Sequence, residues 1–426
     1  MNKTTYTKIQ KGINQISFFL LAIFLTMLFL WLILIGNDKY DGNEIFKVFF
    51  YDSFNNTNQL KEILLLFSPL LIGSLAVFFC LRVGAINLGI SGQMSLAALS
   101  IYFAHYFLQK TGVFSQSNQF LFIPILFLIG MLSATFLSLL CGALKVFFNV
   151  HEILSTIFTN FIVFYIFRYL VSLEEVVNSS KLGTKVPIGD AIAFNLQFGL
   201  ISLTLIFSIF IFIFTIVFVQ KSKFGFKIKI IGSNSQAARY AGINIHRNTI
   251  KVFLISGIFA GLAGIFYYYR DLNNSNLSKS EALPNNGFDT ITIVWLSQSS
   301  LAGIPFSAFF ISLIRAQQKM IKISSVNPII VEMIIGLILL LVAFFAKLSN
   351  DPKSRMRFKK VLFLDYVFTG PKNKKTVNWY NYTNNSEQSF KQNITNKTVI
   401  EKETKTKSIV LQKSFSYQKW KEKRNA

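Results

Sequence analysis

The stretch that decides the fold is a basic loop between two apolar runs: residues 221–248 read KSKFGFKIKIIGSNSQAARYAGINIHRN. The loop contains six Lys or Arg and no Asp or Glu. The flanking runs, residues 198–219 and 249–269, are long enough to cross the ~30 Å hydrocarbon core of a bilayer. A basic loop between two spans is expected on the cytoplasmic side. The loop therefore predicts both a membrane protein and its orientation.

The middle of the loop predicts a short helix between two glycines. The helix is expected to be rich in small residues, and a helix of this kind on a cytosolic loop offers a docking surface for a partner. The predicted surface comprises Gly232, Gln236, Ala237, Ala238, Arg239, Tyr240, Ala241 and Gly242.

The composition extends this prediction to most of the chain. Hydrophobic residues make up 52% of the sequence, and the mean hydropathy is +0.47. Further apolar runs cover residues 17–35, 63–81, 120–144 and 152–171, and residues 328–346 carry one charge, Glu332. Because these runs are continuous rather than alternating, they predict an all-α polytopic membrane protein and exclude a membrane β-barrel.

The charges of the loops set the expected topology. The N-terminus, residues 1–16, is basic and is expected inside, whereas residues 36–62 hold five acids against three lysines and are expected outside. The transmembrane domain is expected over residues 17–346. Within it, residues 291–314 are broken by a polar Ser297-Gln298-Ser299-Ser300 segment. Two half-helices there, as in broken membrane helices that line cavities, place the C-terminus inside and give eight to ten membrane helices.

The C-terminal segment, residues 347–426, differs in composition. Its last 76 residues hold 18 Lys or Arg and 6 Asp or Glu, which is half of the net charge of +24. With few aliphatic clusters, it is expected to be a disordered cytosolic tail. Binding to anionic lipid, at roughly 1 kcal/mol per basic residue, is the alternative. Nucleic-acid binding is disfavoured because Trp379, Tyr380 and Trp420 are scattered.

Signatures of enzymes are missing from the sequence. His151 and Glu152 begin like a zinc-protease helix, but Ser155 stands where the second histidine is required. The chain has three histidines, none at metal-ligand spacing, and its two cysteines lie in apolar runs. No phosphate-binding G-x-x-x-x-G-K-[ST] loop is found. We therefore expect no catalytic residues, no metal and no cofactor.

Residues 82–93, RVGAINLGISGQ, combine glycines with polar groups in an apolar region. One interpretation is a broken helix that lines a path for a neutral polar solute, with Asn87, Ser91 and Gln93 as its hydrogen-bonding groups. The alternative is close helix packing through small residues. Asn160, in the middle of a predicted span, is expected to bind either the solute or a neighbouring helix.

Two further sets of residues have structural interpretations. Gly257, Gly261 and Gly264 recur at helical spacing and predict a helix-packing face. The charged residues at the ends of the runs are expected to extend their side chains toward the membrane surface. They are Arg82, Lys145, Glu152, Arg168, Lys251 and Arg315.

Several of these segments resemble ABC importer permeases of the simple-sugar and nucleoside type. Residues 87–93, NLGISGQ, resemble the family's Asn-Ile-Gly-Val-Glu-Gly-Gln, and residues 152–160, EILSTIFTN, resemble Glu-Val-Ile-Ser-Thr-Ile-Met-Leu-Asn. Residues 232–243 and 256–264 resemble the family's coupling loop and next helix. Residues 286–289, NGFD, resemble the start of a late span. The resemblance covers residues 60–346 in the same order. Ser91 and Gln236 depart from it, since the family usually has Glu at the first position and often at the second.

The resemblance implies a type II importer architecture and the partners of such a system. These are a second permease, cytosolic ATPases that bind ATP and dock at residues 236–242, and an extracellular substrate-binding lipoprotein. Within the family, residues 87–93 and 152–160 are most similar to the nucleoside branch, so the resemblance implies a nucleoside as the substrate. Simple sugars or branched-chain amino acids are the alternatives. From other classes, an ion-coupled secondary transporter and a membrane scaffold acting through the basic tail remain as hypotheses.

Overall fold

The computed structural model of this chain describes residues 53–112, 119–173, 201–268, 286–323 and 329–350, together with positions 24, 28, 51, 176, 197 and 198. All of these belong to one compact unit, Met1–Asp351. The basic N-terminus, the tail from residue 351 and most of the predicted first span lie outside the described residues.

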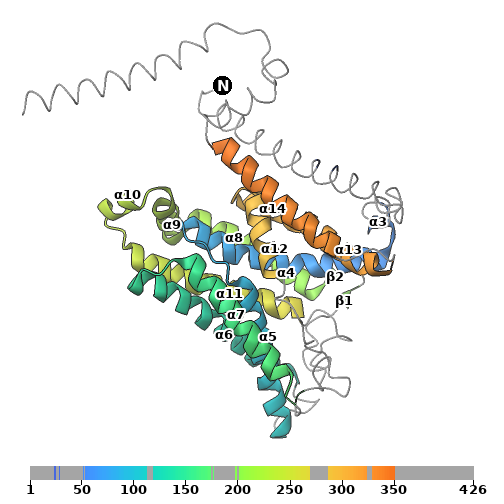
Figure 1. Ribbon diagram of the computed structural model, residues 1–426. Coiled ribbons are helices and arrows are strands. Elements are labelled where there is room, and N and C mark those ends of the chain that lie inside the picture. The colour runs from blue at the N-terminus through green and yellow to red at the C-terminus, as the bar shows by residue number, and fades with distance from the viewer. Residues whose placement is uncertain are drawn as a thin grey trace, which may run out of the picture. The chain divides into compact units, whose positions relative to one another are not determined.

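The described part of the chain is a bundle of helices (Figure 1). Its short strands, β1 (Gln197–Phe198) and β2 (Ile201–Ser202), form one antiparallel pair. The helices are α3 (Ser53–Asn55), α4 (Thr57–Arg82), α5 (Ile90–Lys110), α6 (Gln119–Phe148), α7 (Glu152–Val171), α8 (Leu203–Lys221), α9 (Lys223–Ser233), α10 (Ser235–Tyr240), α11 (Ile245–Tyr268), α12 (Asn286–Leu296), the 3₁₀ turn η3 (Leu301–Gly303), α13 (Ile304–Ile323) and α14 (Ile329–Asn350).

This architecture confirms the predicted all-α membrane fold. Five of the described helices, α4, α6, α7, α8 and α11, are long and apolar enough to cross a membrane. The bent pair α12–α13 raises the number to six if it counts as one span. The helices α5 and α14 add 21 and 22 residues of helix.

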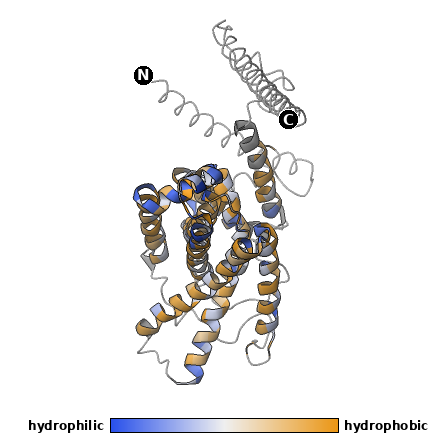
Figure 2. Ribbon diagram, turned by 90° about the vertical axis from the view of Figure 1, so that its left-hand side faces the viewer, coloured by the Kyte–Doolittle hydropathy of each residue, from blue (hydrophilic) through white to orange (hydrophobic). Residues whose placement is uncertain are grey.

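The position of each helix in the bundle follows from how much of it is buried. In the most apolar 18-residue stretch of α4, 89% is buried inside the bundle, against 28% in the corresponding stretch of α8. The helix α4 is therefore central and α8 peripheral. The helix α11 packs along both α4 and α6. Large apolar side chains on α6, α7 and α8 are exposed, among them Phe136, Tyr165 and Phe210. Figure 2 shows that apolar residues predominate along the helices of the bundle. Since lipid accepts such side chains without cost, these faces suit contact with the bilayer.

The basic loop is more regular than the sequence predicts. It contains two helices, α9 and α10, instead of one. Gly232 lies inside α9 and does not bound α10. The boundary is Asn234, whose side chain accepts a hydrogen bond from the Ala237 N–H at 3.0 Å. Gly242 follows α10 with a φ of 72°, in the left-handed region that favours glycine.

The broken span in the C-terminal third is confirmed. The two segments Gly287–Leu296 and Leu301–Gln317 are bent by 118° relative to each other. Gln298 and Ser299 lie in the turn between them, and both have positive φ, at 51° and 57°. Such a conformation is costly for residues with a Cβ, so the turn is held by the surrounding packing.

Candidate functional site

The predicted solute-path residues lie around a break between two helices. The helix α4 ends at Arg82, and α5 begins at Ile90. Asn87 lies in the non-helical segment between them, and its side-chain oxygen accepts a hydrogen bond from the Gly89 N–H at 2.9 Å. Its side-chain nitrogen donates to the Ser256 hydroxyl at 2.9 Å and to Gln93 at 3.3 Å. Asn87 therefore joins the start of α5 to α11.

Asn160 of α7 binds the same segment from the other side. Its Oδ1 accepts from the Gly92 N–H at 2.8 Å, and its Nδ2 donates to the Leu88 carbonyl at 2.8 Å. The residue before α5, Gly89, has no side chain to cap that helix. Because the first N–H groups of a helix have no partner within it, Asn160 supplies the cap from another helix.

The close approach of these helices depends on Gly92. A Cβ on Gly92 would lie 2.7 Å from Asn160 Oδ1 and 3.0 Å from its Cα. Thr156, one turn earlier on α7, accepts the Leu88 N–H at 3.3 Å. The sequence pattern in residues 82–93 thus has a direct physical reason. Gly92 allows α5 to approach α7, and the side-chain amides bind backbone groups that have no partner within a helix.

All four predicted path residues are buried in the single chain. Asn87, Gln93 and Asn160 are fully buried, and Ser91 is 2% exposed. The structure brings Asn87, Gln93 and Asn160 together through hydrogen bonds to the chain itself. Contact between these side chains and a solute stays a prediction.

The three glycines of the predicted packing face lie against neighbouring helices. A Cβ on Gly257 would lie 2.5 Å from Thr135 Cα, and one on Gly261 would lie 2.8 Å from Met131 Cα, both on α6. Gly264 faces α5 instead, with Met94 O at 2.5 Å from the added Cβ. These positions allow α11 to approach two helices at once.

The predicted docking surface is exposed except at one residue. Gln236, Ala237, Arg239, Ala241 and Gly242 are exposed, and Tyr240 is 93% exposed. Ala238 is fully buried. A partner therefore has access to one side of α10, and Ala238 belongs to the side that packs on its own chain.

Gly232 has a structural role that its sequence context did not reveal. It lies on α9, and a Cβ there would collide with the Arg82 carbonyl at the end of α4. The end of α4 leads directly into the segment that holds Asn87. The loop that carries α10 is therefore in backbone contact with the start of the candidate site.

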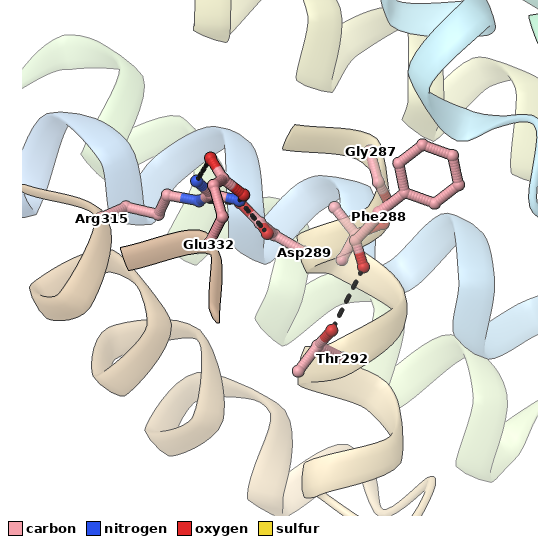
Figure 3. A network of polar contacts seen from close by, with 7 residues as sticks. Gly287, Phe288, Asp289, Thr292, Arg315 and Glu332 are labelled. Atoms are coloured by element: carbon pink, nitrogen blue, oxygen red, sulfur yellow. Dashed lines mark hydrogen bonds and ion pairs between the residues drawn. The ribbon is translucent and has the colours of Figure 1, made fainter. Parts of the chain in front are cut away.

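The structure contains a largely buried group of charges that hydropathy and residue spacing do not predict. The Arg315 guanidinium donates to both carboxylate oxygens of Asp289, at 2.5 and 2.7 Å, and also to Glu332 (Figure 3). The side chains of Arg315 and Asp289 are 6% and 2% exposed. The prediction that Arg315 extends toward the membrane surface is wrong, because two carboxylates from other helices bind it inside the bundle.

A second ion pair connects two other residues that were expected at the membrane surface. Lys145 Nζ lies 2.7 Å from Glu152 Oε1, and both side chains are partly buried. These residues flank the short link between α6 and α7, where Asn149 has a φ of 55°. The pair joins the two helices on either side of this link.

Comparison with known proteins identifies the family. The family described as the permease component of branched-chain amino acid transport systems matches residues 59–343. The chain belongs to this family. It is therefore a multi-pass membrane permease, and the nucleoside branch of the superfamily includes several of its relatives.

Individual relatives of this permease differ in their stated substrates. The nucleoside ABC transporter permease protein of Lactococcus lactis is 25% identical over 69% of this chain and 81% of its own length. The glucose ABC transporter permease protein of Haloferax volcanii is 24% identical over 70% of this chain and 80% of its own length. An uncharacterised protein of Mycoplasma genitalium is 29% identical over 77% of this chain, which spans 64% of that protein's length. No solved structure matches the chain.

Proposed function

We propose that this chain is the permease subunit of an ATP-driven importer for nucleosides. The similarity to a nucleoside permease over 69% of the chain supports this substrate class. The buried amide network of Asn87, Gln93 and Asn160 supports the role, since it holds a non-helical segment at membrane depth, as a translocation path requires.

The exposed surfaces support two of the partners in this proposal, an ATPase and a second permease. The exposed side of α10, with Ala237 and Tyr240, is the docking site for a cytosolic ATPase. The exposed apolar faces of the bundle contact lipid and a second permease, and an extracellular lipoprotein delivers the solute. The chain itself binds no ATP in this scheme.

An uptake experiment tests the substrate class. The complex is purified with the chains that accompany it, reconstituted in vesicles, and supplied with ATP and a labelled nucleoside. Competition by unlabelled nucleosides, and none by glucose, is the expected result. ATP-driven uptake of labelled glucose without uptake of the nucleoside favours the sugar alternative, and uptake that stops with the proton gradient at constant ATP favours a secondary transporter.

A substitution on α10 tests the docking site. Tyr240→Asp places a charge at a position that is 93% exposed, so the fold is expected to tolerate it while the ATPase contact is lost. We expect ATP-driven uptake to fall to background at normal abundance in the membrane. Gln109→Asp, at an exposed position near the far end of α5, is the control. Normal uptake in the Tyr240 variant contradicts the docking assignment.

Deletion of the tail separates transport from the scaffold hypothesis. Removal of residues 351–426 takes away 18 basic residues and none of the described helices. We expect solute flux to persist in the shortened chain. Loss of flux at normal membrane abundance shows instead that the tail is required.

A further inference from the structure

The first turn of α12 contacts three other helices, α4, α5 and α13, and is linked to α14 through Arg315. Asp289 binds Arg315 of α13, which in turn binds Glu332 of α14. Thr290 lies against Gly73 of α4, and a Cβ on that glycine would be 2.6 Å from Cγ2 of Thr290. Gly287 lies against α5, and a Cβ there would collide with the backbone of Ser91.

These contacts connect the buried charges to the candidate site. Ser91 is the second residue of α5, whose start is held by Asn87 and Asn160. Gly287 and Asp289 are two residues apart on one turn of α12, so the position of Asp289 fixes the position of Gly287. Figure 3 shows Asp289 directed toward Arg315 and Glu332, with Gly287 and Phe288 beside it.

Arg315 is the residue whose loss would cost this cluster the most, because it is the partner of both carboxylates. Two carboxylates and one guanidinium from three helices meet in a region where Asp289 and Arg315 have little contact with solvent. Removal of one partner from a buried ion pair leaves an uncompensated charge, which is strongly destabilising at that place. The bidentate contact also fixes orientation, which a single point charge does not do.

We infer that Arg315 is a positioning residue that, through Asp289, holds the first turn of α12 against Ser91 at the start of α5. The contact itself is independent of the proposed function, whereas its consequence for solute uptake rests on it. When the ion pair between Arg315 and Asp289 is lost, the first turn of α12 separates from α5. The start of α5, at the candidate site, is then no longer covered by α12.

A cysteine introduced at position 91 reports this contact directly. Ser91→Cys changes one atom at a position that is 2% exposed. The native Cys80 and Cys141 are both fully buried and lie on α4 and α6, so they report the integrity of the rest of the bundle. The full chain is placed in lipid nanodiscs, treated with a polar maleimide, and the modified cysteines are identified by mass spectrometry.

Addition of Arg315→Met is expected to speed modification of the introduced cysteine by more than about tenfold, because the cost of an unpaired buried charge exceeds the free energy of a tenfold change. Cys80 and Cys141 stay protected. The control is Arg168→Met, the same substitution at an exposed arginine of α7, which leaves the introduced cysteine protected. Protection of that cysteine in the Arg315 variant overturns the inference, and equal modification of all three cysteines replaces it with a general structural role.

A second variant tests the same contact if Arg315→Met does not fold. Gly287→Ala introduces a methyl group against the Ser91 backbone and is expected to expose the cysteine at position 91 without changing any charge. Gly336→Ala on α14 is its control, since a Cβ there meets no atom within 4 Å. Unchanged protection of the introduced cysteine in Gly287→Ala contradicts the inference. Failure of these labelling results is separate from failure of nucleoside uptake, because no solute is present.

Discussion

Asn160 shows how one side chain organises the centre of this membrane protein. Its amide satisfies the Gly92 N–H and the Leu88 carbonyl, two backbone groups that flank the start of α5. In an apolar interior a backbone group without a hydrogen-bond partner is destabilising. A residue with both a donor and an acceptor is required, which explains an asparagine at this fully buried position of α7.

We expect Asn160→Leu to lower the stability of the chain. Leucine has a similar size but leaves two buried backbone groups without a partner, at about 1–3 kcal/mol each. Thermal unfolding in detergent measures the effect as a lower midpoint. Phe158→Leu, at a position that is 58% exposed, is the control and is expected to unfold like the parent. Equal midpoints for the two variants contradict the capping role of Asn160.

Among the helices, the contact between α9 and α4 connects the basic loop to the candidate site. Gly232 allows α9 to lie on the Arg82 carbonyl, and the chain then continues from Arg82 to Asn87. In the proposed function, a displacement of α10 is expected to reach the segment between α4 and α5 through this backbone contact. The helix α11, whose glycines lie against α6 and α5, offers a second connection, because its Ser256 accepts a hydrogen bond from Asn87.

We expect Gly232→Ala to uncouple ATP hydrolysis from uptake. The added methyl group collides with the Arg82 carbonyl and separates α9 from α4, while the exposed side of α10 is unchanged. In reconstituted vesicles, the ratio of solute imported to ATP hydrolysed is expected to fall several-fold. Ser233→Ala, the exposed neighbour on α9, is the control. An unchanged ratio in the glycine variant places the coupling elsewhere.

Most of the helices were predictable from the sequence because length and hydropathy act locally. Residues 152–171 were predicted as a span and form α7 with the same bounds. The start of α8 was placed at residue 198, but Ser202 caps the helix by accepting the Leu205 N–H at 3.2 Å, so α8 begins at Leu203. The helix α9 was missed since its lysines interrupt the apolar pattern.

The polar contacts of the site were predictable only in part. The glycines and amides of residues 82–93 indicated a broken helix, yet the pairing of Asn160 with Leu88 joins residues 72 positions apart. Likewise, Asp289 and Arg315 are 26 residues apart and meet only because the chain bends by 118° between them. Pairings of this kind depend on tertiary structure, which hydropathy and spacing do not specify.

At the scale of the whole molecule, the charges around Arg315 bear on the topology. Asp289 is in the first turn of α12 and Glu332 in the first turn of α14, and both bind Arg315. The starts of α12 and α14 therefore lie at the same depth. A single span between them would separate these starts by the ~30 Å thickness of the hydrocarbon core. The bent pair α12–α13 is thus better described as a re-entrant segment than as a crossing.

This arrangement predicts the side on which the C-terminus lies. Near its end α13 lies beside the start of α4, where Gln317 donates to Ser53, and α4 runs from there to its contact with α9, so α14 begins away from the basic loop and returns to its side. We expect Ile400→Cys to react with a membrane-impermeant maleimide only after cells are permeabilised. Asn274→Cys, between α11 and α12, is the control and should react in intact cells, because this segment is expected outside. The native cysteines are buried and should add no background labelling. Labelling of the Ile400→Cys variant in intact cells would require α12–α13 to cross the membrane, which the shared contact of Asp289 and Glu332 with Arg315 opposes.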